Sequence, residues 1–250
     1  MAGHTWRELD PSHPRYGEIF RTYLAHTDEK KQQQRLLHHI VDALPQREIF
    51  VDVGAGTGLF TAGLAEKFDR TVAVEPDPEL RRELRTACPD AEVLPVPIAA
   101  AEPSGPADLV LCSHVLYYVP EAEWPGHVAR MLSWLRPGGE LVLVLQHPEN
   151  ACMAMVRHFG GPTRSLLAVL PYLDGAAGRR YRAERVRQPA SVCVPDLATA
   201  LDVCQLVVGP LEDSSSRAAV AGYLHTHCAD PGGGFALSCD QEFLRIRREA

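Results

Sequence analysis

Hydrophobic residues in the first part of the chain repeat with the spacing of a helix. From Tyr16 to Leu44, apolar side chains recur every three or four positions, in two pieces separated by the polar bend at 26–29. One face of an α-helix repeats with this period. The spacing therefore predicts two N-terminal helices.

The pattern then changes to short apolar runs separated by helical segments. The runs are IFVDV (49–53), TVAVE (71–75), AEVLPV (91–96), ADLVLCS (107–113) and ELVLVLQ (140–146). The helical segments between them are Leu59–Phe68, Pro78–Cys88 and Glu121–Leu135. Strands that are apolar on both faces and alternate with helices are typical of a parallel sheet covered on both sides. Short right-handed connections make this an open, doubly wound α/β sheet.

The rhythm breaks after Gln146. Residues 147–190 contain several Pro and Gly residues, and we interpret them as an insertion that caps one end of the sheet. Within it we expect two helical stretches, at Met153–Phe159 and Ser165–Leu170. A regular pattern then resumes, and we expect it to complete the sheet. Its expected elements are a helix at Val194–Val203, a strand at Gln205–Val208, a helix at Ser216–His227 and a closing strand at Phe235–Ile246.

Length and charge narrow the function classes. At 250 residues the chain has room for one sizeable α/β domain, and its 46% hydrophobic and 23% charged residues are typical of a soluble globular enzyme. A net charge of −7 argues against a surface that holds nucleic acid or an anionic membrane. The sequence has no apolar run long enough to span a bilayer. We therefore expect a cytoplasmic protein with neither partner.

The cysteines point to the same compartment. Seven are scattered singly with no CxxC pair, which favours the reduced thiols of a cytoplasm over a disulfide framework. His225, His227 and Cys228 resemble metal ligands, but residues two apart on a helix face different directions. We predict no metal site. The sequence gives no basis for an oligomeric state.

A glycine loop follows the first apolar run, in the stretch VDVGAGTGLF (51–60). In open α/β sheets, ligands bind beyond the carboxyl ends of the strands at this position. A triphosphate loop would need a lysine that this loop lacks, and the third glycine of a dinucleotide loop would fall on Leu59. Asp52 beside the loop suits a ligand that carries an ammonium group.

Four segments in register resemble class I methyltransferases that use S-adenosylmethionine (SAM). They are FVDVGAGTGLF (50–60), VAVEPD (72–77), DLVLCSHVLYYVP (108–120) and LRPGGELVLVL (135–145). The resemblance covers about a hundred residues. It implies a Rossmann-like, mostly parallel seven-stranded sheet, SAM as cofactor and S-adenosylhomocysteine (SAH) as its product.

The resemblance also implies a cofactor site drawn from these segments. Asp52 would bind the amino group of SAM and Glu75 the two ribose hydroxyls. Ser113 and His114 would lie beside the sulfonium. The other expected contacts come from Gly54, Gly56, Gly58, Pro76, Ile98 and Ala99. Glu75 could instead cap the helix that starts near Pro78, and Ser113 could be a turn residue at the end of its strand.

Two segments resemble histamine N-methyltransferase and its bacterial relatives: YGEIFRTYLAHTDEKK (16–31) and SHVLYYVPE (113–121). This resemblance implies a small-molecule acceptor methylated at an amine or imidazole nitrogen. The family's amine-binding glutamate falls on Glu29, and its glutamine falls on His114, which can also take a proton. The family's asparagine on the last strand would fall near Cys239 or Asp240.

Glu29 and His114 are thus the catalytic candidates, each with a structural alternative. Glu29 could act only on the electrostatics of its helix terminus, and His114 could only donate to the backbone. Aromatic rings can stabilise a cationic acceptor through their faces, and Tyr117 and Tyr118 could equally be core residues. The candidate acceptor-binding residues are Tyr16, Phe20, Tyr23, Tyr117 and Tyr118.

The domain plan follows from both resemblances. We expect a single methyltransferase domain over 1–250, with a helical lid at 1–46, the SAM-binding core at 47–146, a capping insertion at 147–190 and completion of the sheet at 191–250. The expected function is small-molecule N-methylation in bacterial secondary metabolism.

Other functions stay open at this point. An O-methyl or carboxyl methyltransferase would use His114 as a base. A NAD-dependent oxidoreductase and a catalytically silent SAM-binding partner are less favoured. The end of the fourth strand lacks the carboxylates that a Mg²⁺-dependent catechol enzyme would need, and it lacks the NPPY-like motif of nucleic acid amino-methylation.

Overall fold

The computed structural model describes residues 4–10, 13–175 and 180–249, and these form two compact units. The sheet unit comprises Gln34–Leu145, Leu166–Val186 and Glu242–Ala250, and the accessory unit comprises Met1–Gln33, Gln146–Ser165 and Arg187–Gln241. Each unit is built from segments far apart in the sequence. The roles of 1–46 as a lid and 147–190 as a cap stay predictions.

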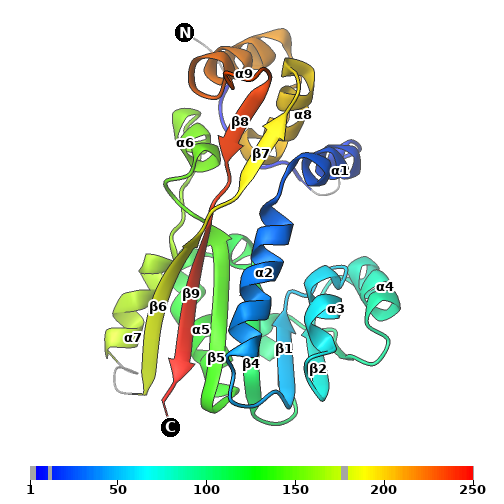
Figure 1. Ribbon diagram of the computed structural model, residues 1–250, viewed down its shortest axis with the longest axis vertical. Coiled ribbons are helices and arrows are strands. Elements are labelled where there is room, and N and C mark those ends of the chain that lie inside the picture. The colour runs from blue at the N-terminus through cyan, green and yellow to red at the C-terminus, as the bar shows by residue number, and fades with distance from the viewer. Residues whose placement is uncertain (1–3, 11–12, 176–179, 250) are drawn as a thin grey trace. The chain divides into compact units, whose positions relative to one another are not determined.

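A seven-stranded sheet of the order β3-β2-β1-β4-β5-β9-β6 forms the centre of the sheet unit (Figure 1). The four pairs from β3 to β5 are parallel. The chain moves outward from β1 to β3 and then returns to place β4 on the other side of β1, so the strand order reverses at β1 and β4. The strands are β1 (Ile49–Val53), β2 (Arg70–Val74), β3 (Glu92–Leu94), β4 (Ala107–Ser113), β5 (Leu135–Gln146), β6 (Tyr181–Gln188) and β9 (Gln241–Arg248). The predicted fold class, a Rossmann-like, mostly parallel seven-stranded sheet, is confirmed.

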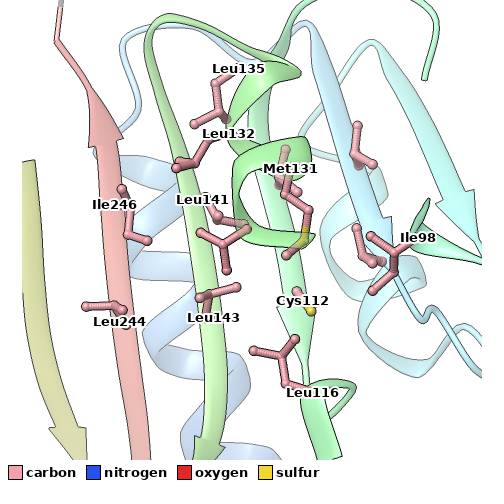
Figure 2. Packing of buried hydrophobic residues seen from close by; sticks show 14 of the residues in the cluster. Ile98, Cys112, Leu116, Met131, Leu132, Leu135, Leu141, Leu143, Leu244 and Ile246 are labelled. Carbon is pink, nitrogen blue, oxygen red and sulfur yellow. The ribbon is translucent and has the colours of Figure 1, made fainter. Parts of the chain in front are cut away.

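Alternate residues of each central strand point to opposite faces of the sheet, and each face has its own apolar core. One core joins the strands to α5 (Trp124–Ser133) through Val128, Met131 and Leu132. Figure 2 shows Met131 and Leu132 among the strand residues of this core. The other joins them to α2 (Glu29–Asp42) and α3 (Leu59–Ala65). Burial on both faces explains why the strands are continuous apolar runs rather than alternating ones.

α4 (Pro78–Ala87) starts where its sequence predicts, whereas the helix expected at Ser165–Leu170 is a 3₁₀ turn that leads into a helix starting at Leu170. α4 begins with Pro78 in its first turn, and the side chain of Asp77 accepts hydrogen bonds from the N–H groups of Glu79 and Leu80. This is the capping arrangement expected of Asp followed by Pro. The unit also contains α7 (Leu170–Gly175) and the 3₁₀ turns η1 (Ile98–Ala100), η2 (Leu116–Tyr118), η3 (Glu121–Glu123) and η4 (Leu166–Val169).

The accessory unit has a separate apolar core and a two-stranded antiparallel sheet of β7 and β8. Its elements are α1 (Tyr16–His26), α6 (Ala151–His158), β7 (Ser191–Val194), α8 (Leu197–Val208), α9 (Ser214–His227) and β8 (Phe235–Ser238), together with the first turn of α2. Within the described part of the chain, no helix combines the length and apolar character that a bilayer crossing requires.

Three sequence predictions in this region are wrong. Gln205–Val208 is the last turn of α8, because a four-residue apolar run has the same appearance in a buried helix and in a strand. That helix begins at Leu197, and Val194 belongs to β7. The expected closing strand Phe235–Ile246 is divided into β8 and β9, and only β9 joins the large sheet.

A further difference lies in residues 147–190, which were expected to form an insertion and which contain strand β6 at the edge of the main sheet. Its sequence, YRAERVRQ, is charged and mostly exposed, so it lacks the apolar pattern that reveals a strand. Arg185 is held there by the buried carboxylate of Glu242 on β9, with an N–O distance of 2.6 Å.

Candidate functional site

The glycine loop lies between β1 and α3, at the point where the strand order reverses. Gly54, Gly56 and Gly58 all have positive φ, at 70°, 58° and 87°. A Cβ on Gly54 would overlap the side chain of Val115, which follows β4, and a Cβ on Gly56 would have no atom within 4 Å. The loop is therefore packed at Gly54 and open at Gly56.

Glu75 follows β2 and lies directly beside the open part of the loop. Its side chain is buried, and its two carboxylate oxygens accept hydrogen bonds from the N–H groups of Gly56 at 2.9 Å and Asp77 at 2.8 Å. Asp77, rather than Glu75, is the cap of α4. The carboxylate thus connects the ends of two neighbouring strands at the edge where ligands bind in this fold class.

Asp52, on β1, is buried beneath the loop, where its carboxylate accepts a 2.6 Å hydrogen bond from the hydroxyl of Thr61. Burial raises the pKa of Asp52 to about 6; the Thr61 hydrogen bond opposes the rise and the nearby charge of Glu75 adds to it. The group therefore changes charge within an accessible pH range.

The end of β4 contains the other expected cofactor contacts. Ser113 is half-buried, and His114 has a φ of 58°, the only positive φ outside glycine among the described residues. The N–H of His114 donates to Val144 O at 2.9 Å, and its ring stacks on Tyr117 with centroids 5.9 Å apart. A left-handed conformation at a non-glycine residue is strained, and such strain is concentrated at functional sites.

The remaining predicted residues of the sheet unit differ in exposure. Ile98 is buried in the apolar core, whereas Ala99 and Pro76 are exposed. Tyr118 is 68% exposed, and Tyr117 is half-buried. The acceptor-binding roles of Tyr117 and Tyr118 both stay predictions.

Glu29, in the accessory unit, is the first residue of α2 and is only 2% exposed. One carboxylate oxygen accepts from Gln241 Nε2 at 2.9 Å and from Lys30 Nζ at 3.2 Å. The other accepts from the hydroxyl of Tyr23 and from Gln146 Nε2 at 3.3 Å. A buried carboxylate is costly without such donors, so this cluster fixes Glu29 in one orientation.

The sequence analysis identified Glu29 and Tyr23 but missed the amides around them. Gln33 lies one turn after Glu29 on α2, and its carbonyl oxygen accepts from Gln241 Nε2 at 2.8 Å. The spacing of four residues in a helix was the available signal for Gln33. Gln241 directly follows Cys239 and Asp240, the positions near which the family's last-strand asparagine was expected, and its amide donates to Glu29. The placement of that asparagine stays a prediction.

Rings on α1 extend this cluster. Tyr16 stacks on Phe20 with centroids 6.0 Å apart, and Phe20 stacks on Tyr23 at 6.3 Å. Tyr23 is nearly buried, and the other two are half-buried. Within the described residues, no group of three or more His, Cys, Asp or Glu side chains is placed to hold a metal ion.

The doubly wound sheet and its glycine loop are typical of α/β proteins that bind a nucleotide-like cofactor. Comparisons with known proteins show which family of such proteins the chain belongs to. A family model described as "Methyltransferase domain" matches residues 23–190. The chain therefore belongs to this methyltransferase family. The predicted class is confirmed: this is a class I methyltransferase domain whose cofactor is SAM.

Individual relatives support the same class. A trans-aconitate 2-methyltransferase from Azoarcus sp. (strain BH72) is 32% identical over 151 residues, which cover 58% of this chain and 58% of that protein. An uncharacterized methyltransferase from Mycobacterium leprae (strain TN) is 31% identical over 194 residues, 74% of this chain and 64% of that protein. The matched regions thus span less than two thirds of each relative.

A solved structure supports the fold. A putative methyltransferase from Bacillus halodurans C-125 superposes with a TM-score of 0.64 at 14% identity, covering 87% of this chain and 99% of that one. None of these three proteins is named as a histamine N-methyltransferase, so the finer resemblance stays a hypothesis.

We expect Glu75→Ala to weaken SAM binding by about tenfold or more without unfolding the protein. The substitution removes the buried carboxylate that is expected to accept from the ribose hydroxyls, and a lost hydrogen bond to a charged group is worth roughly 1.5–3 kcal/mol. Titration calorimetry with SAM measures the affinity. Glu79→Ala, at an exposed carboxylate four positions further along on α4, is the matched control. Unchanged affinity of Glu75→Ala would show that the ribose lies elsewhere.

We expect SAM affinity to rise with pH as Asp52 ionises around its pKa of about 6. In the expected binding mode, the ionised carboxylate would attract the ammonium group of SAM, whereas the protonated form would not. Stability should move the other way. The pKa of Asp52 is 3.8 in the unfolded chain and about 6 in the folded protein, so the folded protein holds this proton more strongly. The resulting stabilisation of the fold is fully present below pH 3.8 and is lost as pH rises through about 6.

The Asp52→Asn variant checks both trends, because it cannot ionise. Its SAM affinity, measured by calorimetry between pH 5 and 7.5, should be weaker at the upper end and nearly independent of pH. Its thermal unfolding should lack the loss of stability that wild type shows over the same range. Parallel pH profiles for the two proteins would exclude Asp52 as the titrating group.

Proposed function

We propose that this protein transfers the methyl group of SAM to a nitrogen atom of a small amine or imidazole. The observation that carries the proposal is the buried carboxylate of Glu29, which is fixed by amide and hydroxyl donors and flanked by stacked rings. A carboxylate with aromatic neighbours is the chemistry that binds a cationic amine.

The cofactor part of the proposal is supported by the sheet unit. The backbone at Gly56 is open to a ligand, the carboxylate of Glu75 is an acceptor for ribose hydroxyls, and Asp52 can match an ammonium group. Ile98, Ala99, Pro76 and Ser113 are proposed as further contacts. When bound, SAM supplies a methyl group already activated by its sulfonium.

The protein's task in such a reaction is alignment, exclusion of water and proton removal. Positioning the two reactants can be worth several orders of magnitude in rate. An amine must also lose a proton, and a positioned base adds roughly 10²–10⁴-fold. We propose Glu29 as the residue that binds the amine and accepts its proton, and His114 as a second base or orienting group.

A carboxylic acid acceptor is the second candidate, and the identity with a trans-aconitate 2-methyltransferase favours it. Electrostatics argues against it at Glu29. Two like charges 4 Å apart repel by about 4 kcal/mol at an effective dielectric constant of 20. A carboxylate acceptor would therefore need a binding position away from Glu29 and would use His114 as its base.

Transfer of labelled methyl groups from SAM to a panel of acceptors tests the proposal. The panel contains imidazoles, aliphatic amines, phenols and carboxylic acids including trans-aconitate, with products identified by mass spectrometry. Methylation at nitrogen is the expected result. Products methylated only at a carboxylate or hydroxyl would overturn the nitrogen assignment and retain the class. A small ribosomal RNA fragment belongs in the panel, because the exclusion of nucleic acid is still a prediction.

A further inference from the structure

Arg81, on the first turns of α4, contacts the backbone on which Glu75 is mounted. Its Nη1 donates to the carbonyl oxygens of Glu75 at 3.1 Å and of Pro76 at 2.5 Å. These two carbonyls form the turn that leads from β2 into α4. The Arg81 guanidinium thus connects α4 to the backbone of Glu75, six positions earlier in the chain.

With this contact, the backbone N–H, the carboxylate and the backbone carbonyl of Glu75 are all hydrogen-bonded to protein atoms. Its N–H donates to Leu94 O on β3 at 3.1 Å, and its carboxylate accepts from the N–H groups of Gly56 and Asp77. The backbone carbonyl of Glu75 takes part in none of these bonds, and it accepts from Arg81 instead. The direction of the Glu75 side chain depends on the backbone angles between its N–H and its carbonyl, so Arg81 acts on that direction.

The position of Arg81 has a cost of its own. Its Nε is buried and has no hydrogen-bond partner among the described residues. A buried donor without a partner lowers stability. The ammonium group of a lysine at position 81 could donate to the same two carbonyls and would have no buried Nε. Arg81→Lys is therefore a useful variant for comparison with wild type.

We propose that Arg81 is a positioning residue that sets the grip of Glu75 on the ribose of the cofactor. This inference rests on the proposed function, in which Glu75 accepts from the ribose hydroxyls. Arg81 itself touches only protein atoms. Its effect should therefore appear in how well the protein distinguishes a ribose that has hydroxyls from one that lacks them.

The test compares SAH with its 2′,3′-dideoxy analogue by titration calorimetry on four proteins: wild type, Arg81→Met, Arg81→Lys and Arg82→Met. Wild type should prefer SAH by about tenfold or more. Arg81→Met keeps an unbranched apolar side chain without the guanidinium donors and should reduce that preference to within about threefold. Arg81→Lys should restore it. Arg82, exposed and paired with Glu79 on the same helix, is the matched control and should leave the preference unchanged.

The outcomes separate this inference from the function on which it rests. A wild type that does not bind SAH, or does not distinguish the two ligands, overturns the assignment of Glu75 to the ribose and the inference with it. A wild type that distinguishes them while Arg81→Met does so equally well overturns the role of Arg81 alone. Thermal unfolding of each variant shows that the proteins compared are folded, and equal preferences in the Met and Lys variants would also overturn the proposal.

Discussion

Glu29→Gln should lower the turnover of a nitrogen acceptor by about 10²-fold or more, within the range of 10²–10⁴ that a positioned base contributes. Glutamine keeps the size of the side chain and an oxygen that can accept from Tyr23 or Gln241. It lacks the negative charge that binds a cation and cannot accept the proton. The affinity for SAM should stay nearly unchanged, because the residues proposed to bind it belong to the sheet unit.

Steady-state kinetics with the best acceptor of the panel measures the effect, together with calorimetry for SAM. Glu18→Gln is the matched control, because Glu18 is an exposed carboxylate on α1 of the same unit. Equal losses of turnover and SAM affinity in Glu29→Gln would contradict a role toward the acceptor and would make Glu29 a part of the cofactor site. Full turnover would reduce Glu29 to a structural residue of α2.

The two glycines of the loop should respond differently to alanine. Gly54→Ala is expected to destabilise the protein by roughly 2–5 kcal/mol, because the methyl group would overlap Val115 and the positive φ adds backbone strain. Gly56→Ala has the same backbone penalty, about 1–2 kcal/mol, but its methyl group meets no protein atom. That methyl group would enter the space proposed for the cofactor.

Denaturant unfolding and SAM calorimetry on both variants distinguish the two effects. Gly56→Ala should stay folded and bind SAM about tenfold or more weakly. Gly54→Ala should show its main defect in the unfolding midpoint. Wild-type SAM affinity in Gly56→Ala would mean that the open side of the loop faces away from the cofactor, and the proposed binding geometry would have to be abandoned.

The parts of the fold that sequence analysis predicted well are those where burial is uniform. β1 (Ile49–Val53) and β4 (Ala107–Ser113) have the predicted bounds, because both faces of these strands are covered and every residue contributes to an apolar run. The glycine loop was located by its local backbone requirement, which depends on few residues.

Sequence analysis missed features that local residue patterns do not reveal. The amide of Gln241 reaches Glu29 across 212 positions of the chain, and nothing in the local sequence of either residue reveals the contact. The left-handed backbone of His114 was missed because histidine is not a residue that the conformation requires. The last turn of α8 was misassigned because short apolar runs have no distinct period.

The charged sequence of β6, which makes the strand hard to recognise by pattern, also affects how the edge of the sheet behaves. As the last strand of the sheet it presents unpaired backbone groups, which in many proteins are templates for aggregation. Arg182, Glu184 and Arg185 place exposed charge of both signs along that edge. A strand from another molecule would have to strip water from these charges to pair there. The sequence feature that made β6 hard to recognise thus also guards the end of the sheet against accidental extension.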